Sequence, residues 1–153
     1  MTKTLICLCL ALCLCAAGAL SEAGEKTFPL RFDEGFILSL PEGWVSYPAG
    51  GGDIRYALGD GTGVRYLYIL ACDAGGETFD ELRAEIEGRG DCGKISALNL
   101  DGQDFAAFVV QSLNASGCAT LLGGERLTFL FTPQDDSDYM LTVARIMASF
   151  RIA

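Results

Sequence analysis

The sequence predicts an α/β protein of the α+β kind, with a mostly antiparallel sheet sandwiched between helices. Short β-prone runs recur along the chain and are separated by turns that contain glycine. Two segments, one around residue 82 and one at the carboxyl end, carry apolar residues at helical spacing instead. The run 64–72 is largely apolar at both odd and even positions, which indicates a sheet covered on both faces.

Residues 1–23 have the pattern of a cleavable signal peptide. Lys3 is followed by an unbroken apolar run, residues 5–17, and then by small residues, which is the order of a secretory signal. Cleavage after Ala23 is the preferred interpretation, and cleavage after Ala19 is the alternative. A membrane span takes about 20 apolar residues, so this run is nearer to signal length. No stable span is expected after cleavage, and the protein is expected to be secreted.

Cysteines inside the apolar run raise the alternative of a lipid anchor. Cys13 and Cys15 are the acceptors that a bacterial lipoprotein signal would use. Each of them follows a leucine, where such signals carry Gly, Ala or Ser. A lipid anchor is therefore the less favoured interpretation.

The rest of the chain, residues 24–153, is predicted to be a single domain that can bury a core without metal or disulfide. The chain has 20 acidic and 11 basic residues and a net charge of −9. An acidic surface repels phosphate backbones, so nucleic acid is not an expected partner. The chain has no histidine, which excludes His-dependent triads, Cys–His dyads and His-ligated zinc. No catalytic residue, metal site or cofactor is predicted.

Three strands are predicted in the first half of the domain: residues 36–40, 54–58 and 64–72. The glycine-rich segment 59–63 joins the last two as a hairpin loop. It is not interpreted as a phosphate loop, because it precedes a strand and does not open a helix. The resulting register places Tyr56 opposite Tyr66 and Ile54 opposite Tyr68.

A helix, two hairpins and a second helix are predicted in the second half. Thr78 and Glu81 form a capping box that begins the first helix, which ends near Gly88. The two hairpins pair residues 95–100 with 104–111 and residues 118–122 with 126–132. The last helix begins at Ser137. Its apolar stripe consists of Met140, Val143, Ala144, Met147 and Phe150.

The candidate ligand-binding residues are five aromatic side chains of the first half: Trp44, Tyr47, Tyr56, Tyr66 and Tyr68. Tyr and Trp are common in surfaces that bind carbohydrates or peptides. Core packing, with Tyr56 and Tyr66 under the last helix, is the favoured interpretation, and a binding face is the best ligand hypothesis that the chain offers. Trp44 is also a candidate structural anchor.

Two groups of carboxylates are interpreted as structural. Asp135, Asp136 and Asp138 precede the last helix, where acidic residues favour the positive helix end; calcium binding is the alternative. Glu81 and Glu85 lie on a helix face away from the apolar stripe and are predicted to be surface acids.

Three cysteines remain after export, and secreted proteins commonly form disulfides. The predicted strand order places Cys92 and Cys118 at the starts of their strands, at the same end of the sheet. This layout predicts a Cys92–Cys118 disulfide and leaves Cys72 as a buried thiol.

Three segments, FILSLPEGW at residues 36–44, LDGQDFAAF at residues 100–108 and IMASFRI at residues 146–152, resemble the PsbP-like family. That family includes the photosystem PsbP proteins and small exported bacterial relatives of the DcrB kind. The resemblance implies an α/β/α sandwich and an extracytoplasmic accessory role without catalysis. It implies no ligand and no site residue.

We therefore expect an exported bacterial accessory domain that binds an envelope protein or a small ligand. One alternative is a small extracytoplasmic enzyme that uses Cys92 or a carboxylate cluster. In a chain without histidine, only Arg89 and Lys94 are placed to lower the pKa of that thiol. The other alternative is a host-surface adhesin, because Arg89-Gly90-Asp91 matches the tripeptide that integrins bind.

Overall fold

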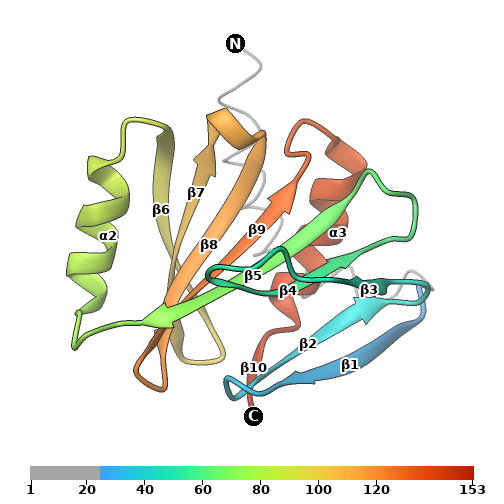
Figure 1. The fold of residues 1–153 in the computed structure, drawn as a ribbon, viewed down its shortest axis with the longest axis horizontal. Helices are drawn as coiled ribbons and strands as arrows, with labels where there is room; N and C mark the ends of the chain where they lie inside the picture. Colours follow the sequence, from blue (N-terminus) through green and yellow to red (C-terminus); the bar gives the residue numbers. More distant parts are fainter. Residues whose placement is uncertain (1–24) are drawn as a thin grey trace.

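The computed structural model describes residues 25–153 (Figure 1). The predicted signal peptide, both cleavage sites and the two candidate lipid acceptors lie outside the described residues. No helix within residues 25–153 is long and apolar enough to cross a membrane.

A seven-stranded antiparallel sheet, the main sheet, forms the centre of the fold, with the strand order β3-β4-β5-β9-β8-β7-β6. Its strands are β3 (Val45–Tyr47), β4 (Ile54–Gly59), β5 (Tyr66–Asp73), β6 (Cys92–Leu100), β7 (Gln103–Val110), β8 (Ala115–Leu122) and β9 (Glu125–Thr132). A short 3₁₀ turn, η1 (Gln111–Leu113), joins β7 to β8. The predicted mostly antiparallel α/β fold is confirmed.

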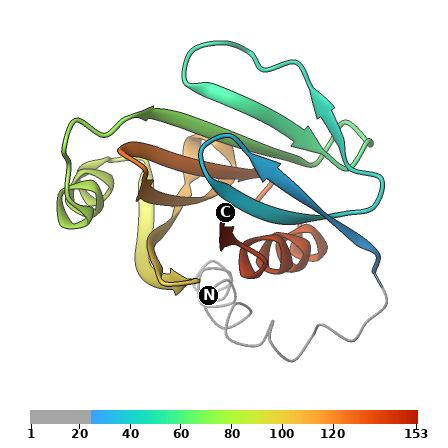
Figure 2. The same cartoon turned by 90° about the horizontal axis from the view of Figure 1, so that it is seen from below.

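One face of the main sheet is covered by the C-terminal helix and by a small second sheet (Figure 2). The helix is α3 (Ser137–Ala148), and the small sheet has the order β1-β2-β10. Its strands are β1 (Thr27–Phe32), β2 (Phe36–Pro41) and β10 (Arg151–Ile152). The sequence analysis predicted β2 but neither of its two neighbours.

The core between these layers is rich in phenylalanine. Phe36 of β2 meets Phe129 of β9 edge to face, with ring centroids 5.4 Å apart. Phe150, which follows α3, meets Phe105 of β7 in the same way at 5.0 Å. All four side chains are fully buried, and edge-to-face pairs add to the stabilisation from burial. The predicted apolar stripe of the last helix therefore faces the core.

The other face of the main sheet is covered only in part. Helix α2 (Phe79–Gly88) begins at the predicted capping box, in which Thr78 and Glu81 bond reciprocally. Its buried residues Leu82 and Ile86 pack with Ala106 and Phe108 of β7 and their neighbours. In Figure 1, α2 lies beside β6 and β7, far from β3 and β4. Because α2 lies over β6, β7 and β8, it leaves the β3–β5 half of this face uncovered.

The β4–β5 hairpin has a different register from the predicted one. Tyr56 pairs with Ile69 and Gly59 pairs with Tyr66, and the ladder shifts between Ile54 and Tyr56. Gly59 belongs to the strand and not to the loop. A Cβ atom at this position would lie 2.6 Å from the carbonyl oxygen of Arg65, so the close approach of the two strands requires glycine.

The predicted disulfide is wrong. Within residues 25–153, no disulfide joins Cys72, Cys92 and Cys118. Cys92 begins β6 and packs on the α2 side, whereas Cys118 is buried on the α3 side. Strand β7 lies between their strands, and β8 begins at Ala115, so Cys118 is not at its start. Cys72 is half-buried and not buried as predicted.

Candidate functional site

Three of the five predicted aromatic residues lie together on the half of the main sheet that α2 leaves uncovered. Tyr66 and Tyr68 alternate along β5 with the core residues Leu67 and Ile69, so they point to the opposite face. Tyr47 lies in the same row as Tyr68, because both pair with Ala57 of β4. We call Tyr47, Tyr66 and Tyr68 the tyrosine face.

The three rings contact one another across the short side chains of β4. The Tyr66 and Tyr68 rings are stacked, with centroids 5.7 Å apart, and the Tyr47 ring meets Tyr66 at 5.5 Å. A Cβ atom on Gly59 would lie 3.0 Å from the Tyr47 ring and 3.4 Å from the Tyr66 ring. The absence of a side chain at Gly59 therefore lets the two rings meet above β4.

The surroundings of the tyrosine face are partly apolar and partly exposed. Tyr68 pairs with Leu130 and Tyr66 pairs with Thr132 in β9, and both partners are half-buried. Val45 at the start of β3 is 44% exposed. The face thus presents aromatic, aliphatic and hydroxyl groups to solvent.

The other two predicted residues lie on the opposite side of the sheet. The register of the β4–β5 hairpin pairs Tyr56 with Ile69, a core residue, and the Tyr56 ring packs edge-on against Phe32 at 4.9 Å. Trp44 is half-buried and lies beside Tyr139 of α3, with ring centroids 6.3 Å apart. The five aromatic residues therefore do not form one surface.

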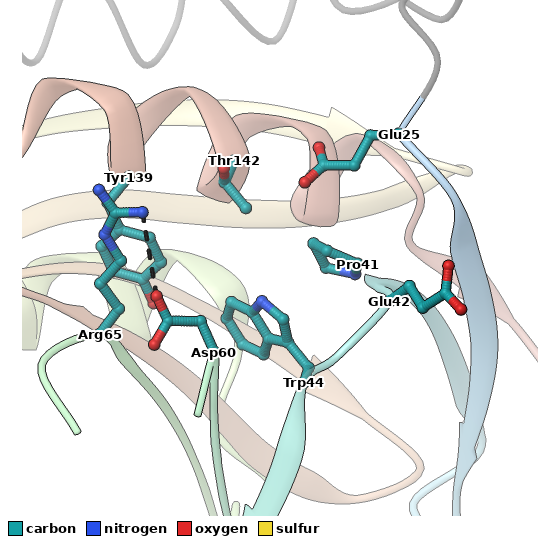
Figure 3. Close-up of a pocket in the computed structure, with 8 residues that line it drawn as sticks. All are labelled: Glu25, Pro41, Glu42, Trp44, Asp60, Arg65, Tyr139 and Thr142. Carbon is teal, nitrogen blue, oxygen red and sulfur yellow. Dashed lines mark ion pairs between the residues drawn. The ribbon is translucent and has the colours of Figure 1, made fainter. Parts of the chain in front are cut away.

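Trp44 instead lines a pocket with a volume of about 140 Å³ between β2, the β4–β5 loop and α3 (Figure 3). We call it the Trp44 pocket. Its lining residues are Glu25, Pro41, Glu42, Trp44, Asp60, Arg65, Tyr139 and Thr142. Apart from Trp44, the sequence analysis missed these residues as a site. No local pattern marks them, since they come from segments far apart in the sequence.

Arg65 and Tyr139 form one wall of the pocket. The Arg65 Nε donates to Oδ2 of Asp136 at 2.8 Å, and its guanidinium lies over the Tyr139 ring, 5.6 Å from the centroid. The Tyr139 hydroxyl donates to the carbonyl oxygen of Tyr66 at 2.7 Å. Burial raises the pKa of Tyr139 well above its ordinary value, so this phenol stays protonated and keeps the hydrogen that it donates to Tyr66.

Three carboxylates surround the pocket. Glu25 pairs with Arg145 at 3.0 Å, and Asp60 accepts a hydrogen bond from the Thr62 backbone at 3.0 Å. Glu42 has no ion-pair partner within residues 25–153. Arg65 is the one cation in the lining. The pocket therefore carries more negative than positive charge.

The enzymatic alternative relied on Cys92 or on a carboxylate cluster, and the surroundings of Cys92 and Glu85 do not favour either. Burial raises the pKa of the Cys92 thiol, Asp91 raises it further, and Arg89 opposes this only in part. A nucleophilic cysteine needs a lowered pKa. Hydrogen bonds from Arg126 and Arg89 lower the pKa of Glu85 to about 2, which makes it a permanently ionised structural acid at neutral pH.

The aspartates before α3 and Glu81 at the start of α2 also have structural partners. Asp136 is the N-cap residue of α3, and Asp135 accepts a hydrogen bond from Asn114 at 2.8 Å. Glu81 completes the capping box of α2. No group of three or more Cys, Asp or Glu side chains in the described part of the chain is placed to hold a metal ion.

The Arg89-Gly90-Asp91 tripeptide lies exposed after α2. Its two charged ends have partners within the domain: Arg89 pairs with Glu85 at 2.8 Å, and Asp91 accepts from the Ser112 hydroxyl at 3.2 Å. The adhesin hypothesis stays a prediction.

No protein-family model and no curated protein matches the chain. Among solved structures, it is similar to cyanobacterial PsbP (CyanoP) from Synechocystis sp. PCC 6803, with a TM-score of 0.62 and 15% sequence identity. The similarity covers 87% of this chain and 96% of that protein. It confirms a PsbP-like fold, as the resemblance of the sequence implied, and at this identity it shows the fold alone.

Proposed function

We propose that the mature chain is an exported, non-catalytic binding domain, and that its tyrosine face binds a partner protein of the cell envelope. The observation that carries this proposal is the position of Tyr47, Tyr66 and Tyr68. They lie side by side on a sheet face that neither helix of the described residues covers. Tyrosine is enriched in protein interfaces and in their binding hot spots.

A protein fits this face better than a small ligand does. The rings come from two strands with a third strand between them, and they lie on an open sheet surface. Each ring offers apolar area together with a hydroxyl group, which suits an interface that is apolar at its centre and wet at its edge. Binding would bury rings that are now half-exposed.

The absence of catalysis is supported by the residues themselves. The chain has no histidine, and the pKa of Cys92 is raised. The PsbP-like fold and the signal-peptide pattern of residues 1–23 support an accessory role outside the cytoplasm.

Site-specific cross-linking tests the proposal. A photoreactive phenylalanine analogue placed at Tyr68 is expected to cross-link a discrete protein in the native cells. The same analogue at Ala84, which is exposed on α2, is the matched control and should not give that product. Tyr47→Ser combined with the probe at Tyr68 should reduce the yield, because it removes a neighbouring ring.

A product of equal yield from Ala84 would contradict the proposal, as would the absence of any product at Tyr68 in a folded protein. Cross-linking to a glycan or lipid at Tyr68, without a protein product, would also overturn it and would point to another envelope component.

A further inference from the structure

We infer that the Trp44 pocket binds an organic ammonium group. This pocket lies on the α3 side of the main sheet, opposite the tyrosine face, so the inference does not depend on the proposed partner protein. Three features carry it: an aromatic wall, an excess of carboxylates, and a volume that suits a small organic group.

The aromatic wall is Trp44. Indole is the side chain that attracts cations most strongly through its ring face. The ring is half-buried, and its packing beside Tyr139 holds it in place. Figure 3 shows the indole on one side of the pocket, between Asp60 and Pro41, with Thr142 on the opposite side.

The same site already shows a cation on an aromatic ring. The Arg65 guanidinium lies 5.6 Å from the centroid of the Tyr139 ring. It is held there by Asp136, and it leaves the neighbouring ring of Trp44 to a ligand. A bound ammonium group would repeat over Trp44 the arrangement that Arg65 has over Tyr139.

The charge of the lining favours a cation. Glu25, Glu42 and Asp60 supply three carboxylates, against the guanidinium of Arg65 in the lining and that of Arg145, which pairs with Glu25. Glu42 has no ion-pair partner among the described residues, and the nearest contact between Asp60 and Arg65 is 3.9 Å. A chain with a net charge of −9 also attracts cations at long range.

The ligand expected here is an organic cation and not a metal ion. The three carboxylates are not gathered into a group that could hold a metal within residues 25–153, and indole is not a ligand for hard cations. The volume of about 140 Å³ far exceeds the roughly 10–15 Å³ that one water molecule needs. It suits a methylated ammonium or the end of a lysine side chain.

Fluorescence of Trp44 provides a direct test, because it is the only tryptophan of the chain. Titration of the mature domain with choline chloride is expected to give a saturable change. Sodium chloride at equal ionic strength and 3,3-dimethylbutanol, the uncharged analogue of choline, should not. A parallel titration uses Nα-acetyl-lysine methylamide, which represents the lysine side chain of a partner protein. Tighter binding of choline would indicate a small quaternary ammonium as the ligand, and tighter binding of the lysine derivative would indicate a lysine.

Two variants test the role of the carboxylates. Glu42→Gln and Asp60→Asn should each weaken binding by at least about threefold, the effect of one charge about 6 Å away in water. Asp80→Asn on α2, an exposed acid far from the pocket, is the matched control and should bind as the wild type does. Glu42 is exposed, so its variant should fold even if Asp60→Asn does not, which circular dichroism would show.

Equal binding of the uncharged analogue, no saturable change with either cation, or unchanged affinity in a folded Glu42→Gln would each overturn the inference.

Discussion

Arg65 and Asp136, 71 residues apart in the sequence, form an ion pair with Nη2 and Oδ2 2.8 Å apart. The same carboxylate caps α3, because its Oδ1 accepts a hydrogen bond from the Tyr139 backbone at 3.0 Å. The pair therefore joins the residue before β5 to the first turn of α3. It also places the Arg65 guanidinium over the Tyr139 ring, which forms one wall of the Trp44 pocket.

Arg65→Gln is expected to lower the free energy of unfolding by about 1 kcal/mol, because it removes a partly exposed ion pair and a cation–π contact. Arg55→Gln is the control. Arg55 is 50% exposed and its contact to Glu125 is 3.6 Å long, so a change below about 0.5 kcal/mol is expected. Urea unfolding of both variants measures the difference. Equal stability of the two variants would show that the Arg65 pair adds nothing.

Gly117→Ala is expected to destabilise the fold by about 1–3 kcal/mol, as overpacking does. Gly117 of β8 pairs with Phe108 of β7, and the Phe108 ring lies across it. An added Cβ atom would lie 2.5 Å from the ring Cζ of Phe108. Thermal unfolding followed by circular dichroism should show a clearly lower Tm.

Gly88→Ala provides the matched control. Gly88 ends α2, and an added Cβ atom there meets nothing within 4 Å. Alanine has the higher helix propensity, so the Tm should be unchanged or slightly raised. A Gly117→Ala variant as stable as Gly88→Ala would mean that Phe108 can move away at little cost.

Glu85 should make the stability of the domain depend on acidic pH. Hydrogen bonds from Arg126 and Arg89 lower its pKa from 4.5 to about 2 in the folded protein. As the pH falls, the unfolded chain takes up the proton first. The stabilisation from Glu85 is therefore complete above about pH 4.5 and is lost as the pH falls towards about 2.

Unfolding of the Glu85→Gln variant should depend less on pH in this range than that of the wild type. Arg126→Gln should show a similar loss, because Arg126 donates from Nη1 to Glu85 at 3.0 Å. The double variant should add little to either single one. If both single variants kept the pH dependence of the wild type, the acid-dependent stability would not come from the contact between Glu85 and Arg126.

Features that depend on neighbouring residues could be predicted from the sequence. The capping box of Thr78 and Glu81 begins α2, and the Asp101-Gly102 turn joins β6 to β7 as expected. The stripe that includes Val143 and Phe150 is buried in the core. Each of these follows from hydrogen bonds or periodicity within a few residues, and the local pattern is sufficient to decide them.

The position of each candidate residue on the sheet could not be predicted in the same way. The register at the loop end of the β4–β5 hairpin pairs Gly59, and not Tyr56, with Tyr66, so Tyr56 pairs with Ile69 on the core side and is separated from Tyr66. Side chains alternate between the two faces of a strand, so a shift of one residue moves a side chain to the other face. Cys92 and Cys118 lie on different faces because their partners in β7, Val110 and Ala107, are an odd number of residues apart along the strand.

The mostly antiparallel α/β fold, the two helices and the concentration of aromatic residues in the first half all follow from local patterns in the sequence. Strand register and layer packing depend instead on contacts between distant segments. These contacts place Tyr47, Tyr66 and Tyr68 on an open face and Trp44 in a pocket on the other side. Those contacts divide one cluster of aromatic residues in the sequence between two surfaces.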